Sequence, residues 1–308
     1  MNYTFSQLRI FSKVRETLSI TRAAEELHLT QPAVSIQLKK FQAQFDLPLT
    51  EVVGRRLHFT DFGHEIADAA DKILDEVMAI DARTHARKGK LTGVLKLSVV
   101  STGKYVMPHL LSGFVNKHPE LELKMDVTNK ARVVQSLAQN EVDFALVSVL
   151  PAQLRLQSLE LMKNKLYVVG NGQQQVRKTT APQSLLETLP LIYREAGSGT
   201  RHVFEQFLLR NKLRVKMKME LTSNEAVKQA VLAGMGYSIM PLIGIKNELN
   251  SGELRIIPVK GFPILSIWYL TWLKDKQHSH AASAFLQYLK TEKANIIAER
   301  FKWIDQIK

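Results

Sequence analysis

Residues 19–45 read SITRAAEELHLTQPAVSIQLKKFQAQF, a pattern that predicts two short helices joined by a tight turn. The turn falls at His28-Leu29-Thr30, between two runs that carry apolar residues at helical spacing. Thr30 is placed to cap the second helix, and Pro32 lies in the first turn of that helix, where its missing N–H costs nothing. We therefore expect a helix-turn-helix near the N-terminus.

The second of these helices has an unusual outward face. Its apolar side is expected to be buried and comprises Val34, Leu38, Phe41 and Phe45. On the opposite side Ile36 lies between a serine and two lysines, which makes a poor surface for water. It suits the DNA major groove, where apolar groups touch thymine methyls, hydroxyls bond base edges and lysines neutralise phosphates. The alternative is a small helical core with one exposed isoleucine.

The segment TRAAEELHLTQPAVSIQLKKFQ, residues 21–42, resembles the winged helix-turn-helix of the LysR-type transcriptional regulators. Further similarities run nearly the full length of the chain. The resemblance implies an α/β protein with an N-terminal winged helix-turn-helix, a long linker helix and a two-lobed effector domain similar to periplasmic binding proteins. It also implies double-stranded promoter DNA and RNA polymerase as partners, and a homodimer or homotetramer.

A short hairpin, or wing, is expected after the second helix, where residues 46–63 read DLPLTEVVGRRLHFTDFG. Two arginines at its tip can contact phosphates or enter a minor groove, although ordinary surface charge is the alternative. Thr50 stands where the family usually has an aromatic residue, which leaves the local packing open. We predict that bases are read by Pro32, Ala33, Ser35 and Ile36. The predicted contacts to the backbone or nearby base edges are Gln31, Lys39, Lys40, Arg55 and Arg56.

One long helix is predicted over residues 61–87, with Asp61 as its cap. An apolar seam along it spans about two heptads and comprises Ile66, Ala70, Ile73, Val77 and Ile80. A seam this short also suits a helix that packs on its own domain. The resemblance favours dimerisation, because the linker helices of the family pair. Lys88-Gly89-Lys90 is then expected to be a hinge.

From Leu91 onward, strands alternate with helices, which predicts parallel sheets with right-handed crossovers and ligands beyond the carboxyl ends of the strands. The resemblance implies that the last strand and the last helix return to the first lobe. The expected domains are 1–60 for DNA binding, 61–90 for the linker, 91–163 with 264–308 for lobe I, and 164–263 for lobe II.

Several predicted strands end in hydroxyl or amide residues that open a helix. Helix N-termini attract anions, so four such starts facing one cleft predict a site for a small anionic effector, although a single start is most often only a cap. Lys104 and Arg201 lie in first turns and could pair with the anion, or could be solvated charges. The predicted effector-binding residues are Ser101, Thr102, Lys104, Asn129, Ser148, Ser198, Gly199, Thr200, Arg201, Thr222 and Asn224.

Four stretches resemble the carbon-fixation operon regulators (CbbR-type) within the family: STGKYVMPHLL, NEVDFALVS, REAGSGTR and SNEAVKQAVLAGMG. That resemblance implies a phosphorylated metabolite or nucleotide as the effector. Related branches share pieces of these stretches, and regulators of sulfur or nitrogen metabolism are an alternative.

Composition narrows the function classes. The chain has 308 residues, no cysteine and a net charge of +13, and no apolar run or signal-peptide pattern, so a soluble cytoplasmic protein without a membrane segment is expected. The segment 1–60 carries a net charge of only +3, so the basic excess is not evidence for DNA binding. Phosphate-binding, hydrolase and zinc-protease motifs are missing, so no enzyme activity, cofactor or metal is expected.

Two other classes remain as alternatives to a regulator. One is a small-molecule binding protein or transferase whose N-terminal helices only dimerise it, against which the outward face around Ile36 argues. The other is a nonspecific architectural DNA binder, against which the elaborate C-terminal region argues.

Overall fold

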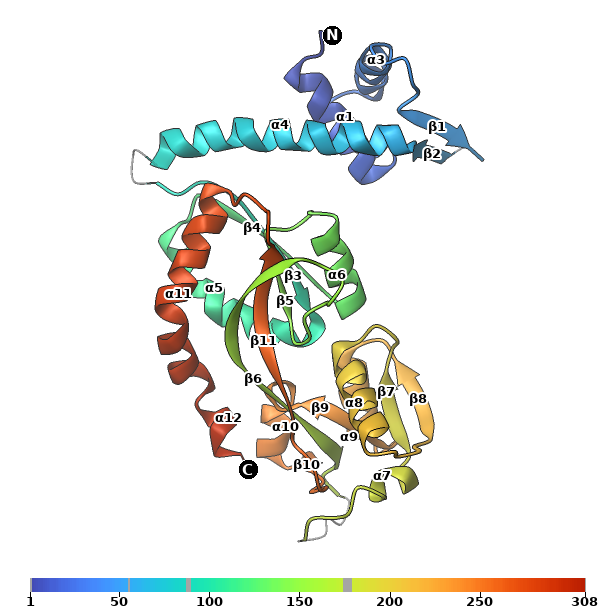
Figure 1. The fold of residues 1–308 in the computed structure, drawn as a ribbon, viewed down its shortest axis with the longest axis vertical. Helices are drawn as coiled ribbons and strands as arrows, with labels where there is room; N and C mark the ends of the chain where they lie inside the picture. Colours follow the sequence, from blue (N-terminus) through green and yellow to red (C-terminus); the bar gives the residue numbers. More distant parts are fainter. Residues whose placement is uncertain (1, 55, 87–89, 174–178, 308) are drawn as a thin grey trace. The chain divides into compact units, whose positions relative to one another are not determined.

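The N-terminal part of the chain builds three short helices, a hairpin and one long helix (Figure 1). The computed structural model describes residues 2–54, 56–86, 90–173 and 179–307, and the chain forms two compact units, Met1–Lys90 and Leu91–Lys308. The elements of the first unit are α1 (Phe5–Thr17), α2 (Ile20–Glu26), α3 (Gln31–Gln42), β1 (Thr50–Val53), β2 (Arg56–Phe59) and α4 (Asp61–Ala86).

The helix-turn-helix forms as predicted. The Thr30 hydroxyl accepts a hydrogen bond from the Ala33 N–H, with Pro32 in the first turn of α3. Of the predicted apolar face, Val34, Leu38 and Phe41 are buried and Phe45 is half-buried. Their core is shared with α1, since the Phe11 ring lies 4.9 Å from the Phe41 ring between centroids. The apolar side of α3 is thus fixed against α1, and the opposite side stays open.

The hairpin pairs β1 with β2 in antiparallel register, and Gly54 supplies a positive φ of 56° in its turn. Thr50 stands where the family usually has an aromatic residue, and its hydroxyl accepts a hydrogen bond from the Gln42 side-chain amide. At the start of α4 the Thr60 hydroxyl accepts from the Gly63 N–H at 2.9 Å. The predicted cap at Asp61 was therefore wrong by one residue: Asp61 is the first residue inside the helix.

The predicted seam on α4 divides into two parts. Ala70 is buried and Ile66 half-buried, and both pack on the core of the N-terminal unit. Farther along, Ile73 and Ile80 are exposed and Val77 is half-buried. The helix thus uses the start of its apolar stripe within its own unit. The predicted hinge at residues 88–90 falls mostly outside the described residues, since 88 and 89 are not described.

The second unit is a mixed sheet with helices on its faces (Figure 1). Its strands run in the order β4-β3-β5-β11-β6-β9-β7-β8, with β10 also paired to β6. The strands are β3 (Gly93–Val100), β4 (Leu121–Thr128), β5 (Phe144–Val147), β6 (Leu156–Asn171), β7 (Leu191–Arg194), β8 (Met217–Leu221), β9 (Tyr237–Pro241), β10 (Leu254–Ile256) and β11 (Ile264–Leu273). Strand β3 is parallel to β4 and β5, and β7 is parallel to β8 and β9, as the alternation predicted.

Helices connect these strands, and the longest of them follows the last strand. The elements are η1 (Ser101–Tyr105), α5 (Met107–Lys117), α6 (Lys130–Ala138), α7 (Leu185–Thr188), α8 (Gly199–Arg210), α9 (Asn224–Leu232), η2 (Leu242–Gly244), α10 (Lys246–Ser251), α11 (His280–Phe301) and α12 (Trp303–Gln306). Phe285 on α11 packs on Phe114 of α5, with ring centroids 5.2 Å apart. No helix in the described part of the chain is both long and apolar enough to span a membrane.

Strands β6 and β11 lie side by side and pass through both lobes (Figure 1). The expected lobe boundary at 163/164 therefore falls inside a continuous strand of 16 residues. Near this boundary the buried Asn164 donates a hydrogen bond to Ser266 at 3.1 Å. The register between β6 and β11 shifts between Trp268 and Tyr269. The two lobes are thus joined by a continuous antiparallel ribbon.

One half-buried histidine, whose ring nitrogens are buried, predicts a pH-dependent stability. The His278 ring stacks on Phe144 at 4.9 Å, and neither of its nitrogens has a hydrogen-bond partner among the described residues. Burial lowers its pKa below 6.5, so the unfolded chain binds the proton more readily than the folded chain. The free energy of unfolding should hold above about pH 6.5 and fall as the pH decreases below it. Melting temperatures of the wild type and of His278→Phe between pH 5 and 8 check this, with His280→Asn as the control; an equal decline in all three would contradict it.

Candidate functional site

The outward face of α3 carries the residues predicted to contact DNA. Ile36 is 53% exposed, whereas Val34 and Leu38, two residues before and after it, are buried in the core. Gln31, Pro32, Lys39 and Lys40 are exposed, and Ala33 and Ser35 are half-buried. An apolar and hydroxyl-bearing strip therefore lies beside two lysines on one accessible helix face, which is the composition that base edges and phosphates require.

The hairpin adds a second accessible surface. Arg56 is exposed on β2, while Arg55 lies outside the described residues. Val52 and Val53 are also exposed, at 71% and 57%, so the strand before the turn presents apolar groups as well as charge.

The C-terminal unit contains a recess of about 230 Å³ at the ends of several strands. This volume includes space that is open to solvent, so the enclosed part of the recess is smaller. The residues that line it are Val100, Ser101, Thr102, Asn129, Lys130, Ser148, Arg194, Ser198, Gly199 and Thr200. Seven of them were predicted from the sequence, and they come from elements on both sides of the boundary between the lobes.

Two helix N-termini open at this recess. Asn129 caps α6 through its Oδ1, which accepts from the Arg132 N–H at 3.0 Å. Ser198 caps α8 through its Oγ, which accepts from the Arg201 N–H. Where the two helix starts meet, the Ala131 N–H donates to the Gly197 carbonyl at 3.3 Å. Both helices thus direct their positive ends toward the same small volume, which favours an anion.

Lys130 supplies a full positive charge at the recess. Its side chain is half-buried, and burial lowers its pKa from 10.5. His202, on the first turn of α8, also has a lowered pKa, because of burial and the nearby charge of Lys130. The charge of Lys130 thus disfavours a proton on His202, and an anion beside the two basic groups would oppose this effect.

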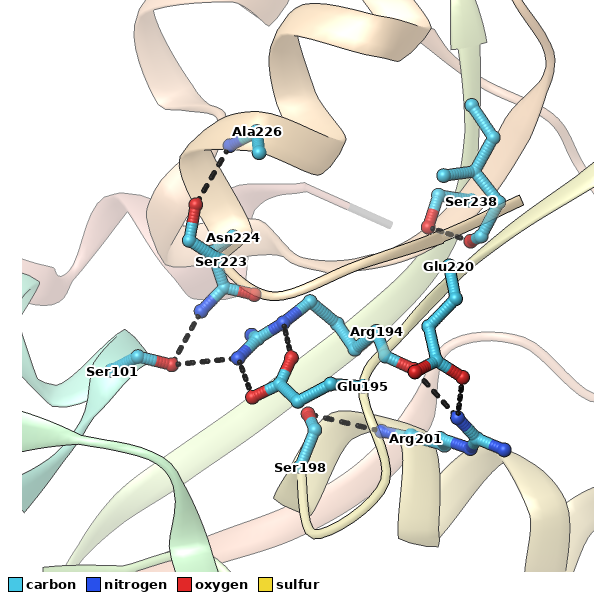
Figure 2. A network of polar contacts seen from close by, with 11 residues as sticks. Ser101, Arg194, Glu195, Ser198, Arg201, Glu220, Ser223, Asn224, Ala226 and Ser238 are labelled. Carbon is cyan, nitrogen blue, oxygen red and sulfur yellow. Dashed lines mark hydrogen bonds and ion pairs between the residues drawn. The ribbon is translucent and has the colours of Figure 1, made fainter.

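A buried polar network connects the recess to the start of α9 (Figure 2). Ser101 accepts two hydrogen bonds, one from the Asn224 side-chain amide at 3.0 Å and one from the Arg194 guanidinium at 3.3 Å. Asn224 thus reaches the predicted cluster through Ser101.

Besides Asn224, three predicted effector residues lie outside the recess lining. Lys104 is exposed, with its ammonium 5.1 Å from the centre of the Tyr105 ring. Arg201 points away and forms an ion pair with Glu220 at 2.6 Å (Figure 2). It forms a second ion pair with Glu205 at 2.7 Å. Thr222 is exposed. Among the described residues, no group of three His, Asp or Glu side chains gathers that could hold a metal ion.

Comparison with known families shows that the two units match descriptions of the same protein family. Residues 5–64 match the description "Bacterial regulatory helix-turn-helix protein, lysR family", and residues 88–294 match "LysR substrate binding domain". The chain belongs to the LysR family of transcriptional regulators. It is therefore a DNA-binding transcriptional regulator with an effector-binding domain, which confirms the function and the fold class expected from the sequence.

Relatives within the LysR family match the chain over almost its whole length. It is 36% identical to the HTH-type transcriptional activator CmpR of Synechocystis sp., over 94% of this chain and 95% of CmpR. It is 35% identical to a RuBisCO operon transcriptional regulator of Allochromatium vinosum, over 96% of this chain and 98% of that protein. The resemblance to carbon-fixation operon regulators is thereby confirmed.

Two solved LysR structures are similar to this one. The regulatory domain of CcmR from Synechocystis PCC6803, in complex with 2-PG, is 35% identical with a TM-score of 0.63, over 66% of this chain and 99% of that chain. Full-length CbnR in complex with its target DNA has a TM-score of 0.65 at 20% identity, over 93% of this chain and 99% of that chain. The second likeness concerns the fold alone.

Sequence reasoning missed two charged residues at the recess of this LysR-type protein, Lys130 and Arg194. Both had a usable signal. Lys130 directly follows the predicted cap Asn129, and Arg194 ends the strand PLIYR. The rule that ligands bind at the carboxyl ends of strands would have found them.

Proposed function

We propose that this LysR-type regulator reads promoter DNA with the outward face of α3 and the hairpin, and that a small anionic metabolite in the recess controls it. The observation that carries the proposal is the convergence of two helix N-termini, Lys130 and several hydroxyls on one small volume. A phosphorylated ligand fits this chemistry best, because phosphate oxygens accept many hydrogen bonds and carry charge. The CcmR structure with 2-PG supports the same ligand class.

The relatives support carbon-fixation genes as the regulated targets, since several are named RuBisCO operon regulators. We infer that the protein acts as a regulator and not as an enzyme, in the cytoplasm where promoter DNA lies. RNA polymerase is the inferred further partner.

We infer that the exposed part of the α4 seam pairs two copies of the chain. Ile73 and Ile80 are the exposed apolar residues that support this, because a second copy would remove them from water. A ligand can switch such an assembly only if it binds two arrangements with different affinity. The recess between two lobes provides a place where such a difference arises.

A footprint tests the proposal. Protection against nuclease is measured on the DNA beside the protein's own gene, with and without 2-PG, other phosphorylated metabolites and small carboxylates. We expect a protected pair of half-sites whose extent shifts with one phosphorylated compound. Protection that no anion changes would reject the proposed ligand class, and no specific protection at all would reject the proposed target.

Substitutions on α3 and the hairpin should separate base reading from phosphate contact. Ile36→Ala should reduce discrimination between operator and random DNA by about 1 kcal/mol, because a base contact is lost. Arg56→Ala should weaken binding to both DNAs alike and lower the slope of log affinity against log salt by about 0.9, since one phosphate contact is lost. Binding curves at three salt concentrations measure both quantities. The assignment fails if the two variants weaken operator and random DNA in the same ratio.

A further inference from the structure

Arg194 and Glu195 form a buried ion pair at the edge of the recess. The guanidinium Nε lies 2.8 Å from Glu195 Oε2, and Nη2 lies 2.9 Å from Oε1 (Figure 2). The two side chains are 3% and 11% exposed. Neighbouring residues within a strand point to opposite faces, but β7 ends at Arg194, and Gly197 with a φ of 86° turns the chain. The carboxylate of Glu195 can therefore return to the side chain before it.

The same guanidinium also holds the opposite lobe. Its Nη2 donates to Ser101, which directly follows β3, and Ser101 accepts a second hydrogen bond from Asn224. Arg194 is thus shared between a carboxylate in its own lobe and a hydroxyl across the recess. A change in the carboxylate contact changes the contact between the lobes.

An anion in the recess meets a cation that already has a partner. Arg194 lines the recess, yet its Nε and Nη2 are bonded to Glu195. A guanidinium binds carboxylate and phosphate with the same planar fork, so one can replace the other with little change in geometry. Glu195 also adds a negative charge beside the site, which repels an anionic ligand.

We propose that Glu195 is an internal competitor for the effector of this protein. Its carboxylate holds Arg194 in the absence of effector, and an anionic group of the bound effector takes over part of that guanidinium. The exchange alters the Arg194–Ser101 bond between the lobes. Glu195 thereby sets both the affinity for the anion and the difference between the two states. This inference rests on the proposed anionic effector.

Titration calorimetry of the full chain tests it, with inorganic phosphate and 2-PG as probes at constant ionic strength. Glu195→Gln keeps the size of the side chain and one hydrogen-bond acceptor but removes the charge. We expect it to bind both anions about tenfold more tightly than the wild type. Glu205→Gln is the matched control, because Glu205 is also paired to an arginine but lies outside the recess lining. Its affinity should stay within about twofold of the wild type.

If Glu195 had only a structural role, removing its charge would not increase the affinity for the anions. If Glu195→Gln keeps a cooperative melting transition and binds the anions no better than the wild type, the proposal is wrong. If Glu195→Gln does not fold, Glu195→Asp decides, because its shorter carboxylate cannot keep both bonds to Arg194: tighter binding supports the competitor and unchanged binding rejects it. If the wild type and all variants bind neither anion, the proposed anionic effector fails, and this inference fails with it.

Discussion

Gly63→Ala should abolish DNA binding by unfolding the N-terminal unit. Gly63 is buried in the first turn of α4, and a Cβ placed there would lie 1.9 Å from the carbonyl oxygen of Leu49. Glycine to alanine inside a helix normally stabilises by about 1 kcal/mol, so helix propensity alone predicts the opposite sign. The contact decides, because the clashing atom belongs to the backbone and cannot rotate away.

The surroundings of Leu49 leave the backbone little room to adjust. Leu49 is 1% exposed, and its carbonyl accepts the Thr60 N–H at 3.1 Å, next to the cap of α4. Moving it disturbs both the core and the helix start. We expect a loss of about 3 kcal/mol or more from the stability of this unit, at the upper end of overpacking effects.

Two measurements on Gly63→Ala check the expectation. Calorimetry should show the transition of the N-terminal unit lowered or lost, while titration with 2-PG should be unchanged, because Gly63 lies outside the C-terminal unit. Glu65→Ala, an exposed change two residues away, is the control and should keep DNA binding near the wild-type level. A Gly63→Ala protein as stable as the wild type would contradict the argument.

Local signals carried the prediction of the helix-turn-helix and of much of the recess. Thr30 caps α3 because its hydroxyl needs only the N–H three residues later, which sequence spacing reveals. The starts at Ser101 and Asn129 meet because the parallel strands β3 and β4 end at one edge, which follows from the order of elements. Ser198 follows β7 of the other lobe and lines the same recess. Both inferences need only short-range chemistry and topology.

Contacts between residues far apart in sequence could not be predicted from the sequence pattern. Arg201 is a basic residue in the first turn of a helix, as expected for a residue that binds an anion. It forms an ion pair with Glu220 on the neighbouring strand β8 instead. Strand β6 begins at Leu156, before the expected lobe boundary at 163/164, because its first part pairs with β11 more than 100 residues later. Such pairings depend on which strand lies alongside, which no local pattern records.

The sequence predicted Lys104 as the lysine of the recess, whereas the structure places Lys130 there. The reason is again a contact that local sequence does not reveal. Both follow polar residues at a helix start. Lys104 belongs to a short 3-10 helix whose turn directs it outward over Tyr105, whereas Lys130 opens α6 beside Gly199 of the other lobe. The two lysines therefore form a natural pair for deciding between the sequence-based and the structure-based assignment.

Lys130→Met should weaken anion binding strongly while leaving the fold intact. Removing a charged hydrogen-bond donor costs about 1.5–3 kcal/mol, so affinity for 2-PG and phosphate should fall roughly 10- to 100-fold. Stability should not fall, because burial already disfavours the charged form of Lys130, as its lowered pKa indicates. Methionine keeps the apolar stem and removes that burial cost, so the melting temperature without ligand should stay level or rise.

Lys104→Met is the matched control, since it removes the same charge from an exposed lysine outside the recess lining. Its anion affinity should change by no more than about twofold, the size of a screened surface charge effect. Titration of both variants, with melting curves taken alongside, ranks the two lysines directly. If Lys104→Met loses the greater share of affinity, Lys130 is not the effector lysine and the ligand enters nearer η1. If Lys130→Met alone loses affinity at unchanged stability, the positive end of α6 and its first lysine hold the anion together.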